Sequence, residues 1–385
     1  MVSTLPSSSS SATWEVMDDK TRELATSMAS EDSFQRRLGL ARAVTLMETK
    51  NIQKKQQGDY LLTYLLQVQV QQQEEENPAD ASLNFRIGLA GPPGSGKSTM
   101  VEALGRYILD ELPTKTTTDA NNITYNPERL AVVCIDPSSS ISGGSILGDK
   151  TRMTELSRHP RAFVRPSANS GVVGGLAAYT DDVVSTCHAA GYPLVLVETV
   201  GLGQSEIEVA QSVDMLILLL PPGGGDELQG VKKGIMEVAN LLCVTKADGH
   251  LLMAARHTAS DYRAAITFLS SMGGEDHTGD QYKVWRPPVL LTSAVTGDGL
   301  DQMWETVCSY RKYLQETGLL EKQRQKQAQY WMWKQFQNLV QDKTRQDPRL
   351  AQTSEQLQEA LRRHQLTPRV AAKNLLETLF PVDRK

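Results

Sequence analysis

The stretch GPPGSGKST, residues 91–99, directly follows the apolar run FRIGLA, residues 85–90. It matches G-x-x-x-x-G-K-[ST], a pattern in which glycines let successive backbone N–H groups curl around a phosphate. The pattern needs a strand before it and a helix after it, and a helix N-terminus attracts negative charge. The stretch therefore predicts a strand, a phosphate-binding loop and a helix that begins near Lys97.

Each residue of this loop is a candidate for nucleotide binding. We expect Lys97 to bridge the β- and γ-phosphate oxygens and the Ser98 hydroxyl to ligate Mg²⁺. The alternative is a glycine-rich turn that holds no ligand, but the motif and its context together favour nucleotide binding. The residues expected to bind the nucleotide are Gly91, Pro92, Pro93, Gly94, Ser95, Gly96, Lys97, Ser98 and Thr99.

Further apolar runs alternate with helical stretches as far as about residue 296. Continuous runs of this kind are typical of strands in a parallel sheet that is covered on both faces. We therefore predict an α/β fold with a mostly parallel sheet and helices on both faces. The expected strands are residues 85–90, 130–135, 194–197, 215–220, 241–244 and 289–291.

Composition excludes several classes of protein. The chain has 385 residues, 40% of them hydrophobic, and a net charge of −5. No apolar run reaches the roughly 18 residues of a membrane-spanning helix, and the acidic balance argues against a general nucleic-acid binder. The four cysteines form no CxxC pair, so no zinc ribbon or redox dithiol is expected, and a reducing compartment is the default. Cys134 and Cys243 lie in apolar runs and are interpreted as small core residues.

Four segments are expected along the chain. Residues 1–13 carry no charge and are interpreted as a disordered tail rather than an Arg-rich transit peptide. Residues 14–82 comprise a helical segment and a Gln-rich linker at 67–80. Residues 83–299 form the nucleotide-type domain, and residues 300–385 are helical, with breaks at Pro348 and Pro368.

Three acidic residues follow predicted strands and are candidates for the magnesium site. Asp136 and Glu198 end the second and third runs, and Asp149 lies in the glycine-rich stretch GGSILGDKTRM. Acids at strand ends of an α/β sheet lie at the ligand-binding edge, although a helix N-cap explains Asp136 almost as well. The loop after Glu198, TVGLGQSE, is expected to sense the γ-phosphate.

A second motif concerns the base of the nucleotide. The run LLCV, residues 241–244, leads into Thr245-Lys246-Ala247-Asp248. Guanine presents two adjacent donors that one carboxylate accepts together, so Asp248 favours GTP over ATP. The stem of Lys246 is expected to lie along the base. After the next run, Ser293, Ala294 and Val295 are expected to bring backbone amides near guanine O6.

These motifs together resemble the MeaB/ArgK group of P-loop GTPases, whose animal members are the methylmalonic aciduria type A proteins. The matching stretches are GPPGSGKST, IDPSSSISGGSILGDKTRM, FVRPSANSGVVGG, VETVGLGQSE, PPGGGDELQGVKKGI and VTKAD. The resemblance implies a GTPase that acts as a chaperone for a vitamin B12-dependent mutase, usually methylmalonyl-CoA mutase. Such a chaperone gates the loading of adenosylcobalamin and protects or reactivates the mutase.

The resemblance also implies roles for single residues. Lys97, Lys232, Asp149 and Glu198 become catalytic candidates, and Ser98, Asp136, Asp149 and Glu198 become the Mg²⁺ ligands. Gln204, Asp226 and Gln229 become switch residues. The cofactors implied are GTP, GDP and Mg²⁺, and residues 300–385 become a C-terminal helical dimerisation region of a homodimer.

The resemblance leaves several questions open. A cobalamin adenosyltransferase is a further candidate partner, and no nucleic acid or membrane is expected as one. The compartment implied is the mitochondrial matrix if the source is eukaryotic, and otherwise the cytoplasm. Three alternatives remain. The first is an ATP-using kinase or transport accessory of the ArgK type, and Asp248 argues against it because it favours guanine. The second is a metallochaperone GTPase, for which the sequence has no Cys/His cluster, and the third is a scaffold that binds nucleotide without hydrolysing it. Inserts at 111–129 and 273–285 are expected to be surface loops.

Overall fold

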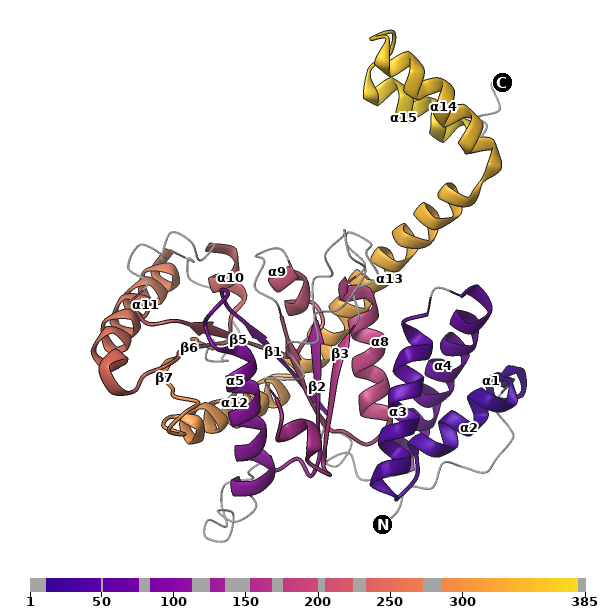
Figure 1. The fold of residues 1–385 in the computed structure, drawn as a ribbon. Helices are drawn as coiled ribbons and strands as arrows, with labels where there is room; N and C mark the ends of the chain where they lie inside the picture. Colours follow the sequence, from indigo (N-terminus) through magenta and orange to yellow (C-terminus); the bar gives the residue numbers. More distant parts are fainter. Residues whose placement is uncertain are drawn as a thin grey trace. The chain divides into compact units, whose positions relative to one another are not determined.

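In the parts of the chain that the computed structural model describes, seven parallel strands form one sheet in the order β3-β2-β4-β1-β5-β6-β7 (Figure 1). The strands are β1 (Phe85–Ala90), β2 (Leu130–Ile135), β3 (Ala162–Ser167), β4 (Leu194–Glu198), β5 (Met215–Leu220), β6 (Leu241–Val244) and β7 (Val289–Leu291). The described residues are 12–49, 51–75, 84–112, 125–135, 153–167, 176–199, 205–223, 233–272 and 285–379.

The six predicted strands are confirmed, and β3 was missed. This strand lies at an edge of the sheet and pairs only with β2 among the described strands. Its sequence, AFVRPS, contains an arginine and a proline, so it lacks the continuous apolar run of the inner strands. An edge position tolerates proline because one side of the strand has no ladder to complete.

Alternate residues of each strand enter two separate cores. On one face, Val195 and Val197 of β4 pack with α8 (Leu176–Ala189), α9 (Ser205–Ala210), α10 (Lys233–Val238) and α11 (Leu252–Met272). On the other face, Leu194 and Leu196 pack with α5 (Lys97–Arg106), the π-helical turn Tyr107–Glu111 and α12 (Leu300–Glu316). The two-residue period of a strand explains this division, and the predicted helical cover on both faces is confirmed.

The N-terminal helices form an outer layer beside α8 (Figure 1). They are α1 (Ala12–Val16), α2 (Asp19–Met28), α3 (Ser33–Met47) and α4 (Ile52–Glu75). The predicted linker at 67–80 is wrong in its first part, because α4 continues to Glu75. Val68 is buried and the Gln67 side chain accepts a hydrogen bond from Thr13, so tertiary contacts hold this Gln-rich segment in a helix.

The chain divides into two compact units, Met1–Gln325 and Lys326–Lys385. The predicted boundary at residue 299 differs from this division, because the apolar face of α12, including Trp304, belongs to the core of the sheet. The second unit contains the rest of α13 (Leu319–Gln346), α14 (Pro348–Arg362) and α15 (Pro368–Leu379). None of the helices among the described residues is long and apolar enough to cross a membrane.

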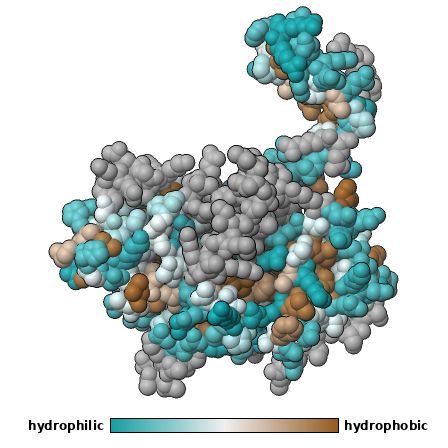
Figure 2. Space-filling view, viewed as in Figure 1, coloured by the Kyte–Doolittle hydropathy of each residue, from teal (hydrophilic) through white to brown (hydrophobic). Residues whose placement is uncertain are grey.

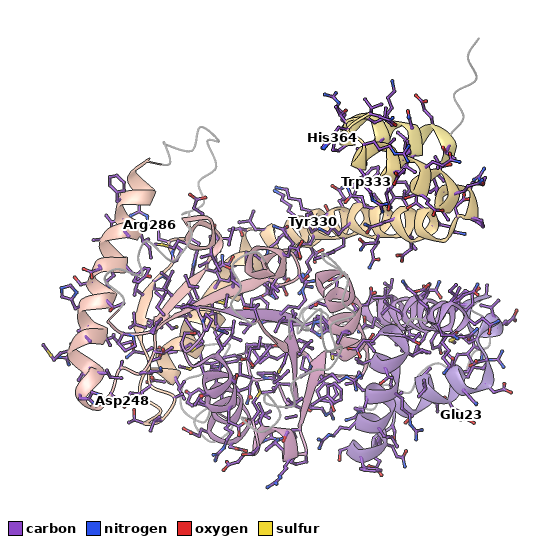
Figure 3. All side chains as sticks on the ribbon, turned by 45° about the horizontal axis from the view of Figure 1, so that its top comes forward. Glu23, Asp248, Arg286, Tyr330, Trp333 and His364 are labelled. Carbon is purple, nitrogen blue, oxygen red and sulfur yellow. The ribbon has the colours of Figure 1, made fainter. Side chains whose placement is uncertain are left out.

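The described surface is mainly polar on the face shown in Figure 2, where hydrophobic residues appear as separate patches among hydrophilic ones. The larger exposed apolar side chains of the second unit lie mostly on α13. Figure 3 marks two aromatic residues of that helix, Tyr330 and Trp333. Exposed apolar side chains that are concentrated on one helix are typical of a protein–protein interaction surface.

A buried ion cluster closes the amino edge of the sheet, where the strands begin. The Asp214 side chain is fully buried just before β5 and accepts hydrogen bonds from the Arg86 backbone at 2.9 Å, the Arg86 guanidinium at 2.7 Å and the Arg324 guanidinium at 2.8 Å. Burial alone would raise the pKa of Asp214, but the two arginines outweigh it and hold that pKa well below its usual range. The cluster is therefore a charged but fully paired part of the core.

Candidate nucleotide site

The loop after β1 has the backbone conformation that its glycines were expected to provide. Gly91 has φ 153°, and a Cβ at this position would clash with the carbonyl oxygen of Leu219 in β5. Gly96 is the N-cap of α5 with φ 87°, a left-handed conformation that costs other residues energy. The predicted order of strand, tight loop and helix beginning at Lys97 is confirmed.

Lys97 lies inside this loop and is only 8% exposed. Its Nζ donates hydrogen bonds to the carbonyl oxygens of Gly91 at 2.7 Å and Pro92 at 3.1 Å. The ammonium group is therefore held at the base of the loop by neutral acceptors. An ammonium in this position suits a phosphate, which offers charged oxygens.

The next residue, Ser98, meets a carboxylate from the neighbouring strand. Its Oγ donates to Glu198 Oε1 at 2.6 Å, and both side chains are buried. The Cys134 Sγ lies 3.8 Å from the other carboxylate oxygen, because Cys134 and Glu198 are register partners on β2 and β4. The structure thus brings together two of the four predicted magnesium ligands.

These groups line one cavity of about 500 Å³ at the carboxyl edge of the sheet. A cavity of this volume is of the size of small-molecule sites. Its walls are Pro93, Gly94, Gly96, Lys97, Ser98, Thr99, Cys134, Ile135, Glu198, Thr199 and Lys246. The cavity forms beside the central strand β1, where successive connections leave toward opposite halves of the sheet, which is the usual ligand site of such folds.

The oxygens of Ser98 and Glu198 fit a magnesium ion. Mg²⁺ prefers hard oxygen ligands and is usually held by one or two protein groups together with phosphates and water. Among the described residues no group of three or more His, Cys, Asp and Glu side chains could hold a metal. A hydroxyl and a carboxylate beside a phosphate loop match the magnesium arrangement, in which the substrate supplies the other ligands.

The segment 245–248, which was predicted to recognise the base, is tied to the phosphate loop by two hydrogen bonds. Thr245 Oγ1 donates to the carbonyl oxygen of Ser95 at 2.7 Å, and Lys246 Nζ donates to that of Gly94 at 2.8 Å. Lys246 has φ 54°, an uncommon value for a residue other than glycine. The Lys246 side chain reaches the phosphate loop and lines the cavity.

Asp248 and Ser293, which were each predicted to contact guanine, are in contact with each other. The Ser293 hydroxyl donates to the Asp248 carboxylate, and Figure 3 marks Asp248 at the end of the segment after β6. The Val295 amide donates to Ser293 Oγ at 3.3 Å, while the Val295 side chain is 84% exposed. Ala294 packs against the core on the α12 side of the sheet.

Six predicted site residues lie outside the described residues. They are Asp136, Asp149, Gln204, Asp226, Gln229 and Lys232. Their roles in metal binding, catalysis and switching stay predictions.

Three cavity residues were missed from the sequence. Cys134 and Ile135 were assigned to a buried strand, and their side chains are buried, but they also line the cavity. Thr199 was assigned to the loop after Glu198, yet it is buried and its backbone N–H donates to the Leu89 carbonyl oxygen at 3.1 Å. All three lie within two residues of a predicted strand end, which is the signal that could have identified them.

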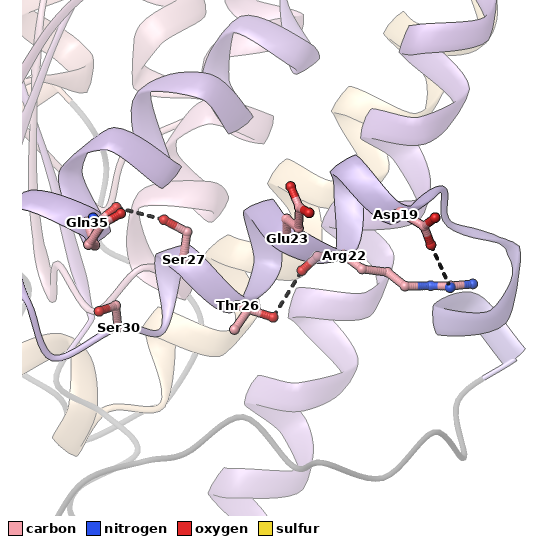
Figure 4. A pocket seen from close by; sticks show the side chains of 7 residues that line it. All are labelled: Asp19, Arg22, Glu23, Thr26, Ser27, Ser30 and Gln35. Atoms are coloured by element: carbon pink, nitrogen blue, oxygen red, sulfur yellow. Dashed lines mark hydrogen bonds and ion pairs between the residues drawn. The ribbon is translucent and has the colours of Figure 1, made fainter.

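A second hollow, of about 540 Å³, lies on the outer surface of α2 and the start of α3 (Figure 4). Its polar side chains are engaged locally: Ser27 Oγ donates to the Gln35 carbonyl oxygen at 2.8 Å, and Arg22 pairs with Asp19 at 3.3 Å. These bonds explain its polar lining without a ligand, so the cavity at the carboxyl edge is the better candidate.

Comparison with known proteins gives a consistent result. The family model described as "Methylmalonyl Co-A mutase-associated GTPase MeaB" matches residues 40–349. The mouse protein "Methylmalonic aciduria type A homolog, mitochondrial" is 40% identical over 338 residues, which are 88% of this chain and 75% of the mouse protein. "GTPase ArgK" of Escherichia coli is 36% identical over 344 residues, or 89% of this chain and 92% of that protein.

A solved structure supports the fold over nearly the same length. The crystal structure of a protein titled "LAO/AO transport system kinase" has a TM-score of 0.61 and 28% identity, and it covers 93% of this chain and 96% of its own. The phosphate loop, the parallel sheet and these similarities agree. The chain is therefore a GTPase that belongs to the MeaB family.

Proposed function

We propose that this GTPase binds GTP and Mg²⁺ in the cavity at the carboxyl edge and acts as a chaperone for a vitamin B12-dependent mutase. The observation that carries the site assignment is the Ser98–Glu198 pair beside Lys97 in one cavity. A hydroxyl, a carboxylate and an ammonium at the mouth of a glycine-rich loop are what a magnesium–triphosphate complex requires.

In this proposal each residue of the site has a separate role in phosphoryl transfer. Lys97 neutralises charge on the β- and γ-phosphates, and the N-terminus of α5 adds backbone N–H donors. Ser98 and Glu198 hold Mg²⁺, which when bound offsets the negative charge of the triphosphate. Asp136 and Asp149 are proposed as further metal ligands, with Asp149 also catalytic, by resemblance to the family.

The same resemblance supports a switch that acts in the complex with the partner. Gln204, Asp226 and Gln229 are proposed to move when the mutase binds, and Lys232 is proposed to assist γ-phosphate cleavage. Lys97 and Glu198 then form the fixed part of the catalytic site. A site of this kind hydrolyses GTP slowly alone and faster when the partner completes it.

Guanine selection is assigned to Asp248. Its carboxylate is oriented by the Ser293 hydroxyl, and the Lys246 stem lies between the phosphate loop and the base segment. ATP would leave the Asp248 acceptors unpaired. Competition of ATP against a fluorescent guanine nucleotide tests this choice: displacement by ATP as effective as displacement by GTP would favour the ArgK-type kinase alternative.

The mutase partner is supported by the printed description of the matching family. The test is GTP hydrolysis by the purified chain with and without methylmalonyl-CoA mutase. We expect the mutase to raise the rate, and Lys97→Ala should lower both the basal and the stimulated rate by about 10²- to 10³-fold. An unchanged rate with wild-type protein would contradict this partner while leaving the GTPase intact. A cobalamin adenosyltransferase, the further candidate partner, is tested in the same assay.

A homodimer through the C-terminal helices is supported by an apolar stripe on α13. Met332, Trp333, Phe336 and Leu339 are each more than half exposed and share one face of the helix. We expect light scattering to give twice 42.4 kDa for the wild type. The double change Trp333→Asp and Phe336→Asp should give the monomer mass, and Gln341→Asp, at an exposed position on the opposite face of α13, should not. A wild-type monomer would contradict the dimer.

A mitochondrial location is proposed by analogy with the mouse relative, whose printed name includes it. The whole chain fused at its C-terminus to a fluorescent protein should co-localise with a matrix marker in eukaryotic cells. A diffuse cytoplasmic signal would contradict the proposal.

A further inference from the structure

Both oxygens of the Glu198 carboxylate meet a donor from the chain itself. Ser98, in the first turn of α5, donates its hydroxyl to Glu198 Oε1 at 2.6 Å. The Cys134 thiol of β2 lies 3.8 Å from Glu198 Oε2, within hydrogen-bonding range for sulfur. All three side chains are buried and line the nucleotide cavity. The carboxylate that we propose as a magnesium ligand is therefore held from two different elements.

Strand register explains why a thiol faces this carboxylate. Cys134 on β2 and Leu89 on β1 are the register partners of Glu198, and both pack in the core that faces α5. The Leu89 side chain has no polar atom, so Cys134 supplies the donor among these two strand neighbours. The sheet itself thus places the thiol next to the carboxylate.

The hydroxyl and the thiol differ in what they can do for a bound cation. A hydroxyl can offer its oxygen to Mg²⁺ and its proton to Glu198 at the same time. A thiol is a weak donor and a soft ligand, whereas Mg²⁺ prefers hard oxygen ligands, so Cys134 is unsuited to bind the cation itself. It is suited to orient Glu198, because a hydrogen-bond partner behind a metal ligand fixes the orientation of that ligand.

A second buried cysteine shows how a thiol with a packing role is surrounded. Cys243 on β6 belongs to the same core as Cys134, and its register partners are Leu219 and Leu290. It is not among the described residues that line the cavity. Cys134 differs from it by lining the cavity and by facing a carboxylate, which packing alone does not require.

We propose that Cys134 is a positioning residue of this GTPase: its thiol holds the Glu198 carboxylate in the orientation that binds Mg²⁺ together with Ser98. This inference rests on the proposed role of Ser98 and Glu198 in binding magnesium. Loss of the thiol should weaken the binding of Mg²⁺ with GTP, and a hydroxyl at the same position should preserve it.

The test measures how much Mg²⁺ the whole chain needs to bind a fluorescent, non-hydrolysable GTP analogue. Cys134→Ala should raise the half-saturating Mg²⁺ concentration by about 10-fold, the lower end of the usual effect of removing a hydrogen-bond partner from a metal ligand. Cys134→Ser should stay within about 3-fold of the wild type, because a hydroxyl is a stronger donor than a thiol and offsets its shorter reach. Alanine and serine leave nearly the same volume, so the difference between them reports the donor rather than the packing.

Two further variants complete the experiment. Cys243→Ala removes a buried thiol from the same core and should leave the Mg²⁺ requirement unchanged. Glu198→Gln removes the proposed ligand charge and should raise the requirement more than Cys134→Ala does. Binding of the analogue at high Mg²⁺ shows that each variant is folded.

The outcomes separate this inference from the site assignment on which it rests. An unchanged Mg²⁺ requirement in Glu198→Gln would overturn the magnesium assignment and the role of Cys134 together. A raised requirement in Glu198→Gln but not in Cys134→Ala would leave the magnesium assignment in place and overturn the role of Cys134. An equal rise in Cys134→Ala and Cys134→Ser would reduce Cys134 to a packing residue and overturn its role as well.

Discussion

The two edges of the sheet use charged residues in opposite ways. At the carboxyl edge, Lys97 and Glu198 lie on the walls of a cavity, and their neighbours are glycines and hydroxyls. At the amino edge, Asp214 has no exposed surface and is enclosed by Arg86 and Arg324. Burial is similar at both edges, so burial of a charge does not by itself indicate function.

The difference lies in what the charges face. Asp214 accepts all its hydrogen bonds from the chain itself, so removing it should damage the fold and spare the chemistry. Lys97 donates to backbone carbonyl oxygens next to an open volume, so removing it should damage the chemistry more than the fold. Substitutions at the two edges can test this division directly.

The largest effect is expected at the amino edge. Asp214→Asn should lower the free energy of unfolding by about 3 to 5 kcal/mol, because Arg86 and Arg324 would keep their charges without a counter-charge. Urea denaturation measures this change. Glu316→Gln, at an exposed pair with Lys312, is the control and should change stability by less than about 1 kcal/mol.

Acid should affect the wild type more than this variant. The pKa of Asp214 is lower in the folded state than the value of about 3.9 expected in the unfolded chain. Its contribution to stability is therefore complete above that value and is lost as the pH falls below it. Between about pH 5 and pH 3, wild-type stability should decline more steeply than that of Asp214→Asn. Parallel profiles would contradict the pairing.

The next effect is expected at the carboxyl edge. Lys97→Ala should lower the rate of GTP hydrolysis by about 10²- to 10³-fold, because a positive charge aimed at the phosphates is lost. Its unfolding free energy should change by less than about 1 kcal/mol. Lys312→Ala removes an exposed lysine and should keep the wild-type rate. Normal hydrolysis by Lys97→Ala would remove this residue from the site.

A smaller effect is expected where the base is recognised. Asp248→Asn should weaken GTP binding by about 2 kcal/mol, or roughly 30-fold, and reduce the preference for guanine. Equilibrium titration with a fluorescent GTP analogue measures both quantities. Asp298→Asn, which alters a neighbouring carboxylate bonded to Thr296, should leave affinity unchanged. An unaltered guanine preference would exclude Asp248 from base selection.

The smallest effect concerns His188, at the end of α8 on the amino-edge side. Burial, with a contribution from the charge of Arg86, lowers its pKa to about 4, against about 6.5 in the unfolded chain. Because the pKa of His188 is lower in the folded state, its contribution to the free energy of unfolding is fully present above about pH 6.5. This contribution is lost as the pH falls toward 4. His188→Gln should remove about 1 to 2 kcal/mol of this loss. His257→Gln, on an exposed position, is the control.

Local patterns in the sequence were enough to predict most of the sheet and the phosphate loop. Inner parallel strands are covered on both faces, so they appear as continuous apolar runs, as in MLILLL of β5. The loop at 91–99 can be recognised because the glycines and the lysine that bind phosphate lie within nine consecutive residues. Edge strand β3 was not predicted because Arg165 and Pro166 interrupt its run of apolar residues.

Pairings between distant residues could not be predicted. Ser98 and Glu198 are 100 positions apart, and Arg86 and Asp214 are 128 apart. Nothing near Asp214 in the sequence indicates that Arg324 is its partner, because the contact depends on how α13 begins. The thiol of Cys134 likewise gains its place in the cavity from strand register, which a single sequence does not reveal.

The two bonds between the base segment and the phosphate loop have a consequence for how the protein folds. They join residues 150 and 152 positions apart, across a sheet in which β5 lies between β1 and β6. Contacts of such long sequence separation form late, because much chain entropy is lost before they are made. The nucleotide site should therefore be among the last parts to assemble, and nucleotide capture during refolding should report arrival at the native state rather than at any partly formed sheet.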